Sequence, residues 1–429
     1  MKFNLYRGAF VGDISVPGDK SISHRSIMLG SLAEGVTRVQ NFLMGEDCIA
    51  TIDCFKQMGV RIDSSETDVT IHGVGLYGLK KPKDILYCGN SGTTMRILAG
   101  LLAFQDFEAV LDGDASLRKR PMMRIVDPLN SMGGNLECEN GKYPPIKINA
   151  GRKPVVLKYQ QPKASAQVKS ALLMAALYSE EGVQIEQPSI SRDHTERMMR
   201  HFGITISENG PSVSVKKGSS FSGRDIFVPG DISSASFFIV AAAIAEKSNV
   251  RIKGVGLNPT RTGIIDVMKL MGATIQIENE RVLNEEPVGD IHILGSNLKG
   301  VTISGDMIPR IIDEIPVLAL AAVFSDGETI ISDAEELRVK ETDRIEAVCS
   351  QLKKMNAEIE EKKDGMRIVG TKQLSGASVK TFGDHRMAMM LSLAGMFAEG
   401  ETTLDDVTCI NVSNPTFYKD LEQLKDIRG

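Results

Sequence analysis

The amino-acid sequence predicts an α/β protein of two similar lobes, each built from three copies of one repeated unit. Three observations support this prediction. The chain has 429 residues, and a single hydrophobic core rarely grows beyond about 250–300 residues. A helix end followed by a strand recurs along the whole chain, and the sequence Val-Pro-Gly-Asp occurs twice, about half a chain apart.

The recurring marker is the end of an amphipathic helix, a Gly or Asn, and then an alternating strand. Gly and Asn tolerate the left-handed conformation that ends many helices, and apolar alternation is typical of strands. The marker occupies Gln57–Ile62, Ser131–Leu136, His201–Ile206, Leu270–Ile275 and Lys354–Ile359. Between markers a short strand, an apolar helix such as Ser170–Leu177, a second strand and an amphipathic helix follow in the same order. The spacing therefore predicts a six-fold repeat.

The sixth copy of the repeat begins near Gly376 and shows no closing strand before the chain ends. Tyr6–Val16 has strand-like alternation and precedes the first helix. We expect this segment to supply the missing strand.

The duplicated tetrapeptide occupies Val16–Asp19 and Val228–Asp231, in each case just before a predicted helix. Pro and Gly together favour a bend, so we expect the chain to cross between lobes at both places. One lobe would then comprise residues 20–229, and the other residues 1–19 plus 230–429. The pattern leaves open two sequential lobes that divide near residue 229.

The composition indicates a metabolic enzyme of the cytoplasm. The formal net charge is −5, which gives no overall attraction to nucleic acid or to an anionic membrane. The N-terminus lacks the apolar run of a signal peptide. The longest apolar stretches, Phe237–Ala245 and Pro316–Phe324, are too short to span a membrane and predict buried helices. The six cysteines form no CxxC pair and the six histidines are scattered, so we expect reduced thiols and no metal site.

Most of the chemically reactive residues fall where helices are predicted to begin. First helices of the repeats would begin at Lys20–Arg25, Asn90–Arg96, Ser165–Lys169, Asp231–Ala235, Asp313–Glu314 and Asp384–Arg386. Second helices would begin at Arg118–Pro121, Arg192–Glu196 and Arg338–Arg344. Ser, Thr and Asp there are common helix caps, but Arg and Lys oppose the helix dipole. Because helix N-termini bind anions, these basic residues indicate a pocket for phosphorylated, acidic small molecules.

The same segments resemble 5-enolpyruvylshikimate-3-phosphate synthases, the 3-phosphoshikimate 1-carboxyvinyltransferases. The resemblance extends over almost the whole chain, in order, at Pro17–Arg25, Gly89–Arg96, Arg120–Met122, Ser165–Gln167, Arg192–Glu196, Arg338–Arg344 and Asp384–Met389. It implies the enolpyruvyl transferase fold, two lobes of three βαβαββ units each, which resembles an inverse α/β barrel. It also implies transfer of the carboxyvinyl group of phosphoenolpyruvate to the 5-hydroxyl of shikimate 3-phosphate in the shikimate pathway, between the lobes, by a monomer without cofactor or metal.

The resemblance also assigns roles to individual residues. It implies that phosphoenolpyruvate is bound by Lys20, Asn90, Gly92, Thr93, Arg120, Gln167, Lys340, Arg344 and Arg386. It implies that shikimate 3-phosphate, mainly on the 20–229 lobe, is bound by Lys20, Ser21, Arg25, Ser165, Ala166, Gln167, Arg192, Asp313 and Lys340. For catalysis it implies Asp313 as the base for the 5-hydroxyl, Glu341, with Lys20, as the candidate for protonating the methylene carbon, and His385 as a candidate helper near the pocket.

The sequence departs from the family pattern at two places. Val412–Phe417 lacks a Lys that some members carry, which removes one phosphate contact. Ala166 stands where some members have a second Ser, so its phosphate contact would come from the backbone. Gly92 leaves room where a bulkier residue would crowd the inhibitor glyphosate, so we expect inhibition that competes with phosphoenolpyruvate.

Three other functions remain as alternatives. UDP-N-acetylglucosamine enolpyruvyl transferases share the architecture but start with a Lys-Asn pair and carry a loop Cys, whereas here Ser21 follows Lys20 and Arg118–Arg120 has no nearby Cys. An RNA 3′-phosphate cyclase-like nucleotidyl transferase would need ATP and a nucleophilic His, for which His385 is the candidate. A binding domain without activity would gain nothing from Asp313 and Glu341 in an anion pocket.

Overall fold

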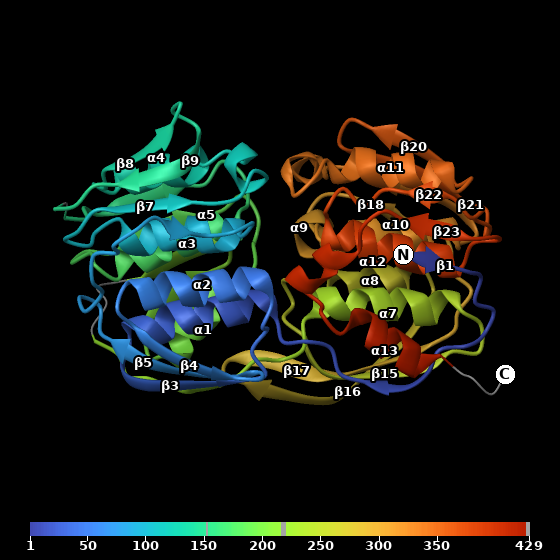
Figure 1. Ribbon diagram of the computed structural model, residues 1–429, viewed down its shortest axis with the longest axis horizontal. Helices are drawn as coiled ribbons and strands as arrows, with labels where there is room; N and C mark the ends of the chain where they lie inside the picture. Colours follow the sequence, from blue (N-terminus) through green and yellow to red (C-terminus); the bar gives the residue numbers. More distant parts are fainter. Residues whose placement is uncertain (152, 216–219, 426–429) are drawn as a thin grey trace. The chain divides into compact units, whose positions relative to one another are not determined.

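The computed structural model describes residues 1–151, 153–215 and 220–425, which form two compact lobes (Figure 1). Lobe 1 comprises Met1–Pro17, Pro229–Val282 and Pro287–Gly429, and lobe 2 comprises Gly18–Val228 with Leu283–Glu286. The chain therefore passes from lobe 1 to lobe 2 at Pro17–Gly18 and returns at Val228–Pro229. Both passages lie in the duplicated Val-Pro-Gly-Asp sequence.

Lobe 2 contains three repeats with the strand and helix order that the sequence resemblance implies. The first consists of α1 (Lys20–Leu32), β3 (Glu34–Gln40), α2 (Glu46–Gln57), β4 (Arg61–Ser65) and β5 (Asp68–Val74). The second consists of β6 (Leu86–Tyr87), α3 (Gly92–Leu102), β7 (Ala109–Asp112), the 3-10 turn η1 (Leu117–Lys119), α4 (Met123–Ser131), β8 (Leu136–Glu139) and β9 (Tyr143–Ile148). The third consists of β10 (Leu157–Gln160), α5 (Ala166–Ala176), β11 (Val183–Glu186), α6 (His194–His201), β12 (Ile206–Asn209) and β13 (Ser212–Val215). The βαβαββ unit is thus confirmed in this lobe.

Lobe 1 repeats the same order three more times. The fourth repeat has α7 (Ile232–Ile244), β15 (Asn249–Gly256), α8 (Gly263–Leu270), β16 (Thr274–Leu283) and β17 (Glu286–Leu294). The fifth has β18 (Thr302–Ile303), α9 (Met307–Ile311), α10 (Ile315–Val323), β19 (Gly327–Ile331), η2 (Glu335–Val339), α11 (Arg344–Lys354), β20 (Glu358–Lys362) and β21 (Gly365–Gly370). The sixth has β22 (Ser378–Val379), α12 (His385–Met396), β23 (Thr402–Leu404), η3 (Thr408–Val412) and α13 (Phe417–Leu424).

Each of the first five repeats has a four-stranded sheet in which a parallel pair of strands is followed by an antiparallel hairpin, whereas the sheet of the sixth repeat has three strands and no hairpin. The second repeat, for example, has the strand order β6-β7-β9-β8, with β6 parallel to β7 and β9 antiparallel to both its neighbours. The third and fifth repeats have the equivalent order. A parallel pair needs a crossover, which the first helix provides in the second, third, fifth and sixth repeats. In these repeats the first helix follows a strand, so its N-terminus lies at the same end of each unit.

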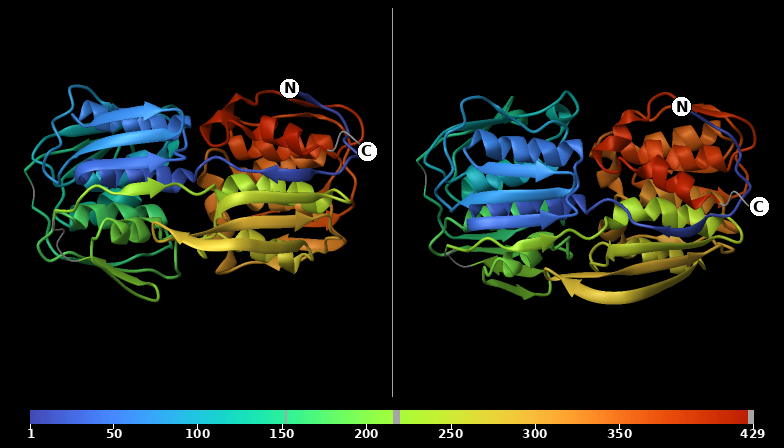
Figure 2. Two further views of the ribbon diagram at one scale, coloured as in Figure 1. Left: turned by 90° about the horizontal axis from the view of Figure 1, so that it is seen from below. Right: turned by 60° about the horizontal axis from the view of Figure 1, so that its bottom comes forward.

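The expectation for Tyr6–Val16 is wrong in its pairing partner. Its strand β2 (Val11–Ile14) pairs in parallel with β15 of the fourth repeat, not with the sixth (Figure 2). The sixth repeat is instead completed by β1 (Lys2–Phe3), which is antiparallel to β23. Two residues are too short to show a strand pattern, and alternation does not reveal a partner.

The position of β2 has a counterpart in lobe 2. There β14 (Asp225–Phe227), the last strand before the chain leaves, pairs in parallel with β3 of the first repeat. The first repeat of each lobe begins directly after a passage of the chain, so it has no leading strand of its own. In both lobes, the segment that leads out of the lobe supplies that strand.

The predicted helix ends are confirmed by the backbone. Positive φ angles occur at the Gly or Asn of every marker: 87° at Gly59, 98° at Gly133, 84° at Gly203, 93° at Gly272 and 65° at Asn356. A side chain with a Cβ atom is strained in this conformation, which Gly and Asn tolerate best. These residues therefore set where each second helix stops and its hairpin begins.

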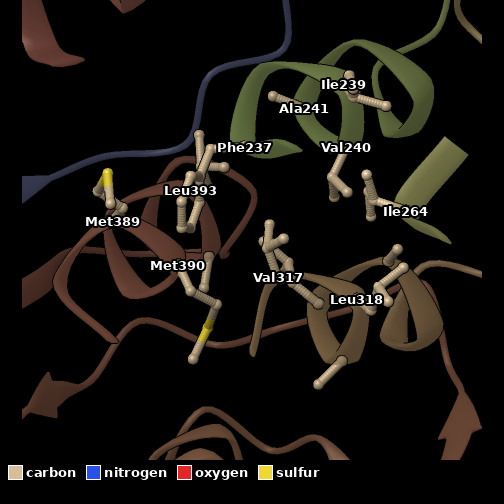
Figure 3. Packing of buried hydrophobic residues seen from close by; sticks show 14 of the residues in the cluster. Phe237, Ile239, Val240, Ala241, Ile264, Val317, Leu318, Met389, Met390 and Leu393 are labelled. Carbon is tan, nitrogen blue, oxygen red and sulfur yellow. The ribbon is translucent and has the colours of Figure 1, made fainter. Parts of the chain in front are cut away.

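The core of lobe 1 is formed by helices that are apolar on all sides, as the sequence predicts for Phe237–Ala245 and Pro316–Phe324. Helices α7, α10 and α12 contact one another, and side chains such as Phe237, Val317 and Met390 are buried between them (Figure 3). Helices of this kind are stable only inside a core, and deleting one such side chain typically costs 2–5 kcal/mol. Among the described residues, no helix is long and apolar enough to cross a membrane.

Candidate active site

The first residues of the helices explain part of the polar pattern in the sequence as capping. Six of these side chains accept a hydrogen bond from a backbone N–H in the first turn of their helix. They are Asp19 on α1, Ser91 on α3, Ser165 on α5, Asp231 on α7, Asp343 on α11 and Asp384 on α12. Capping accounts for these acceptors. It does not account for the basic residues, which have to be placed by other contacts.

Arg25 is buried between three helices of lobe 2. Its Nε donates to Thr195 Oγ1 at 2.6 Å, its Nη2 donates to Ser170 Oγ at 2.9 Å, and its Nη1 donates to the Ser21 carbonyl oxygen at 2.9 Å. These neutral oxygen atoms orient the guanidinium without cancelling its charge. Nearby, the ammonium of Lys20, the first residue of α1, forms an ion pair with Asp47 of α2.

The N-termini of α3 and α5 are joined by Gln167. Its Oε1 accepts a hydrogen bond from Arg96 Nη1 at 2.7 Å, and its Nε2 donates to Thr93 Oγ1 at 3.1 Å. Arg120 lies beside the same helix end and donates through Nη2 to Asn90 Oδ1 at 2.6 Å. The structure thus brings together Asn90, Thr93, Arg120 and Gln167, four of the residues predicted from the sequence.

Gly92 lies against two of these guanidinium groups. A Cβ atom at this position would lie 2.7 Å from Arg96 Nη1 and 3.4 Å from Arg120 Nη1. The missing side chain therefore leaves the space that the arginines occupy. Ser21, Ser165, Ala166 and Arg192, the remaining predicted residues of this lobe, are each half-buried near the start of a helix.

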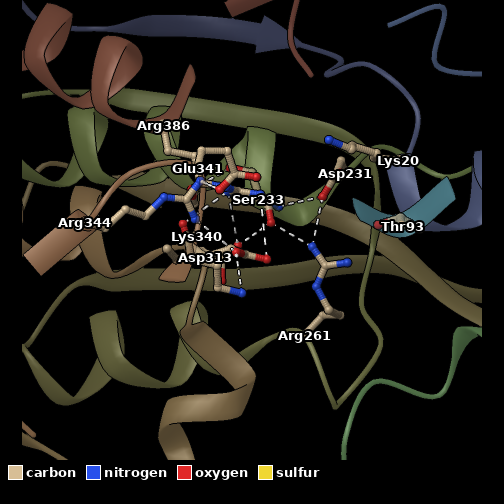
Figure 4. Close-up of polar contacts among 12 residues, drawn as sticks. Lys20, Thr93, Asp231, Ser233, Arg261, Asp313, Lys340, Glu341, Arg344 and Arg386 are labelled. Atoms are coloured by element: carbon tan, nitrogen blue, oxygen red, sulfur yellow. Dashed lines mark hydrogen bonds and ion pairs between the residues drawn. The ribbon is translucent and has the colours of Figure 1, made fainter. Parts of the chain in front are cut away.

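In lobe 1, Arg344 is surrounded by carboxylates (Figure 4). Its side chain is only 1% exposed. Nε donates to Asp384 Oδ2 at 2.8 Å, Nη2 lies 2.7 Å from Glu341 Oε2, and Nη1 lies 3.3 Å from Asp313 Oδ1. Burial opposes the positive charge, but the three carboxylates outweigh it and raise the pKa of Arg344. Arg344 is therefore a permanent cation that fixes two of the predicted catalytic carboxylates.

Asp313 is also approached by two further cations. Lys340 Nζ lies 3.8 Å from Asp313 Oδ1. Arg386 Nη1 donates to the Asp313 carbonyl oxygen at 3.2 Å, and its Nη2 lies 3.9 Å from Asp313 Oδ2. The structure thus gathers Asp313, Lys340, Glu341, Arg344 and Arg386, all predicted from the sequence. His385 is buried as the first residue of α12.

Sequence reasoning gave no site role to a second polar group in this lobe. Ser233 Oγ donates to the fully buried Glu314, and Arg261 Nη2 donates to Ser233 Oγ at 2.7 Å and to Asp231 Oδ1 at 3.2 Å (Figure 4). Glu314 Oε1 lies 3.8 Å from Arg386 Nη1. This group therefore extends from the start of α7 to the cation cluster around Asp313.

The missed residues differ in how visible they were. Asp384 stands at a predicted helix start, where an Asp is a common cap, but its contact with Arg344 depends on the fold. Arg261 lies in the loop before α8, and Asp47 lies in the first turn of α2. Neither stands in a recognisable pattern, so only the packing of neighbouring helices brings them to the site.

The two groups differ in what they can do chemically. The arginines and the lysine of lobe 2 are suited to bind phosphate and carboxylate, because guanidinium groups make paired hydrogen bonds to both. The carboxylates of lobe 1 lie beside cations and can exchange protons with a bound molecule. Among the described residues, no cluster of His, Cys, Asp or Glu is suited to hold a metal ion.

Comparison with known proteins agrees with this chemistry. Residues 7–421 match the family EPSP synthase (3-phosphoshikimate 1-carboxyvinyltransferase). The 3-phosphoshikimate 1-carboxyvinyltransferase of Thermoanaerobacter sp. (strain X514) is 52% identical over 413 residues, which is 96% of this chain and 97% of the relative. That of Geobacter sulfurreducens (strain ATCC 51573 / DSM 12127 / PCA) is 50% identical over 417 residues, 97% of each chain.

The fold is shared with a solved structure as well. EPSP synthase from Acinetobacter baumannii superposes with a TM-score of 0.89 at 44% identity, covering 99% of this chain and 98% of the other. This confirms the predicted two-lobed enolpyruvyl transferase fold. With the match over residues 7–421, it follows that this chain is an enzyme that belongs to the EPSP synthase (3-phosphoshikimate 1-carboxyvinyltransferase) family.

Proposed function

We propose that this enzyme transfers the carboxyvinyl group of phosphoenolpyruvate to the 5-hydroxyl of shikimate 3-phosphate, releasing phosphate. The observation that carries the proposal is the cluster in lobe 1, where Asp313 and Glu341 both contact the buried Arg344. Addition to an alkene and later elimination require one group that accepts a proton and another that donates one. Asp313 as a carboxylate would accept the proton, and Glu341 in its protonated form would donate one.

The proposed reaction has two steps. Asp313 accepts the proton of the 5-hydroxyl while the hydroxyl oxygen bonds to the second carbon of phosphoenolpyruvate, and protonated Glu341 donates its proton to the methylene carbon, which becomes a methyl group. In the second step that methyl group returns a proton to Glu341 and the double bond forms again, while the carbon–oxygen bond breaks and phosphate leaves with the bonding electrons and takes up the proton that Asp313 accepted. Lys20 and His385 are the further candidates for assisting the proton transfer to carbon.

The basic residues would hold the two anionic substrates. For phosphoenolpyruvate the proposed ligands are Lys20, Asn90, Gly92, Thr93, Arg120, Gln167, Lys340, Arg344 and Arg386. For shikimate 3-phosphate they are Lys20, Ser21, Arg25, Ser165, Ala166, Gln167, Arg192, Asp313 and Lys340. Holding both reactants in place converts a bimolecular reaction into a local one, which is worth about 7–11 kcal/mol when the geometry is good.

Some of the proposed ligands belong to lobe 1 and others to lobe 2. The Pro-Gly sequences at Pro17–Gly18 and Pro229–Gly230 would act as the hinges. We expect the enzyme to work in the cytoplasm as a monomer, without cofactor or metal and without nucleic acid.

The experiment is to mix the purified protein with both substrates in the absence of ATP and to measure phosphate release. Mass spectrometry should detect 5-enolpyruvylshikimate 3-phosphate in an amount equal to the phosphate. Replacing shikimate 3-phosphate by UDP-N-acetylglucosamine should stop phosphate release. Turnover with the sugar nucleotide alone, or a requirement for ATP, would refute the proposed function.

A further inference from the structure

Two helices of lobe 2 are joined by pairs of adjacent residues that take no part in the proposed chemistry. Lys169 Nζ of α5 lies 2.6 Å from Glu196 Oε1 of α6. The residues next to them, Ser170 and Thr195, share a hydrogen bond of 2.6 Å between their hydroxyl oxygens. The side chains of Lys169 and Glu196 are 1% and 0% exposed, so this ion pair is fully inside the lobe.

The hydroxyl groups of Ser170 and Thr195 also hold the side chain of Arg25. The guanidinium of Arg25 donates to both hydroxyl oxygens, that of Thr195 through Nε and that of Ser170 through Nη2. The position of the guanidinium therefore depends on how α5 and α6 are set against each other. The ion pair directly beside the hydroxyl pair fixes that setting.

The same ammonium group holds the loop before α6. Lys169 Nζ donates to the carbonyl oxygen of Ser191 at 3.1 Å, and the Ser191 N–H donates to Gln187 Oε1 at 3.2 Å. The Ser191 carbonyl belongs to the peptide bond that leads into Arg192. Lys169 thus anchors the backbone that presents the second arginine proposed to bind shikimate 3-phosphate.

An ion pair inside a protein needs a reason other than stability. Desolvation of two charges roughly cancels their attraction, and apolar residues of the same size are often as stable or more so. This pair contacts the supports of both Arg25 and Arg192. Building on the proposed function, we infer that Lys169 and Glu196 are positioning residues that hold these two arginines for the phosphorylated substrate.

The charges around Arg25 provide a way to test the inference. Burial lowers the pKa of Arg25 to about 10, and the Glu196 carboxylate opposes this more than any other charge. The other charged groups that face it are Asp19 before α1 and Glu286 of β17, which favour its charge, and Arg192, which disfavours it. Burial raises the pKa of Glu196, and the Lys169 ammonium opposes that rise. Neutralising Glu196 should therefore lower the pKa of Arg25 further.

The test is Glu196→Gln, measured by titration calorimetry with shikimate 3-phosphate between pH 7 and 10. At pH 7 we expect the variant to bind shikimate 3-phosphate about tenfold more weakly, because the hydrogen-bonded guanidinium of Arg25 is no longer held in place. As the pH rises, the variant should lose its affinity for shikimate 3-phosphate at a lower pH than the wild type does. KM for phosphoenolpyruvate should change less than twofold (~0.4 kcal/mol). Unchanged affinity with an unchanged pH profile would overturn the inference.

A double variant separates positioning from simple loss of stability. Glu196→Gln alone leaves the Lys169 charge buried, whereas Lys169→Gln together with Glu196→Gln removes both charges and should recover thermal stability. We expect binding to remain weak in the double variant, because neither the anchor of Ser191 nor the charge beside Arg25 returns. Binding that recovers together with stability would show a purely structural role and refute the inference.

Two controls complete the experiment. Glu208→Gln removes an ion pair between Glu208 of β12 and Arg200 of α6, the helix that carries Glu196, and it should leave binding unchanged. The wild-type enzyme is assayed for phosphate release in parallel. If the wild type has no activity, the proposed function fails. If the wild type is active and Glu196→Gln binds normally, only the inference fails.

Discussion

The candidate site differs between the two lobes in how some of its arginines are held. In lobe 2, Arg25, Arg96 and Arg120 donate to hydroxyl, amide and carbonyl oxygens. In lobe 1, Arg261 and Arg344 contact carboxylates. Neutral partners orient a guanidinium and leave its positive charge available to attract a ligand. Carboxylate partners neutralise that charge within the protein. The comparison indicates that lobe 2 is built chiefly to bind anions and lobe 1 chiefly to position carboxylates.

Replacing Asp313 is the strongest test of this difference between the lobes. Asp313→Ala should lower kcat about 10²–10⁴-fold, because the group proposed to accept the hydroxyl proton is lost. The affinity for shikimate 3-phosphate should remain within a few-fold, because the lobe 2 ligands are untouched and Arg386 keeps its bond to the backbone carbonyl of residue 313. Steady-state kinetics and calorimetry measure the two quantities.

The control for Asp313→Ala is Asp313→Asn, which keeps the volume of the side chain. Both variants should lose rate to a similar extent if proton transfer is the cause. A loss of binding as large as the loss of rate would show that Asp313 acts chiefly as a ligand and not as the base, and the division of roles between the lobes would then fail.

Arg344 tests the idea that lobe 1 uses arginine to neutralise its own carboxylates. Arg344→Met removes the cation between Asp313, Glu341 and Asp384, and it leaves the fully buried Asp384 without its counter-charge. We expect a loss of about 3–5 kcal/mol in the free energy of unfolding, measured by urea denaturation.

The matched variant in lobe 2 is Arg96→Met. It removes the guanidinium of Arg96 and leaves the neutral side chain of Gln167 with one hydrogen bond less. This should cost about 1–2 kcal/mol. Equal losses in the two variants would mean that the nature of the partner does not distinguish the lobes.

The sequence predicted the repeat and the helix starts because both depend on local chemistry. Gly59 and its counterparts end helices by their own backbone conformation, and Ser91 and Asp384 cap their own helices. Long-range pairing was less visible. The alternation of Val11–Ile14 indicates a strand but not that β15 is its partner, and Lys2–Phe3 is too short to show any pattern.

The same limit applies to the candidate site. Asp313, Glu341 and Arg344 stand in motifs and were predicted together. The ion pair of Lys169 and Glu196 consists of two residues on separate helices, and Ser233 and Glu314 are 81 residues apart. Such contacts are set by how separate helices pack, within one repeat for Lys169 and Glu196 and between two repeats for Ser233 and Glu314, which no local pattern in the sequence encodes.

Gly92 allows a smaller change to be made in lobe 2 alone. In Gly92→Ala the new methyl group would lie 2.7 Å from Arg96 Nη1, so the guanidinium has to shift. We expect KM for phosphoenolpyruvate to rise about fivefold, equivalent to ~1 kcal/mol, with unchanged affinity for shikimate 3-phosphate. Glyphosate should inhibit the wild type in competition with phosphoenolpyruvate. In the variant, its inhibition constant should rise by a larger factor than KM for phosphoenolpyruvate. A flat dose response of the wild type at millimolar glyphosate would contradict this.

The smallest expected effect concerns Arg118, a lobe 2 arginine that is held by a carboxylate. Its half-exposed side chain pairs with Asp112, and this hydrogen bond lowers the pKa of Asp112 below the usual 3.8. Because the folded state lowers this pKa, ionised Asp112 favours folding, and the pair stabilises the lobe above about pH 4. This stabilisation is lost as the pH falls through the lowered pKa of Asp112. Arg118→Met should therefore unfold slightly earlier than the wild type at pH 6, and the difference should shrink on acidification below pH 4. KM for both substrates should stay the same, because in lobe 2 a carboxylate-bound arginine serves stability. A rise in either KM would show that Arg118 belongs with the ligand-binding arginines after all.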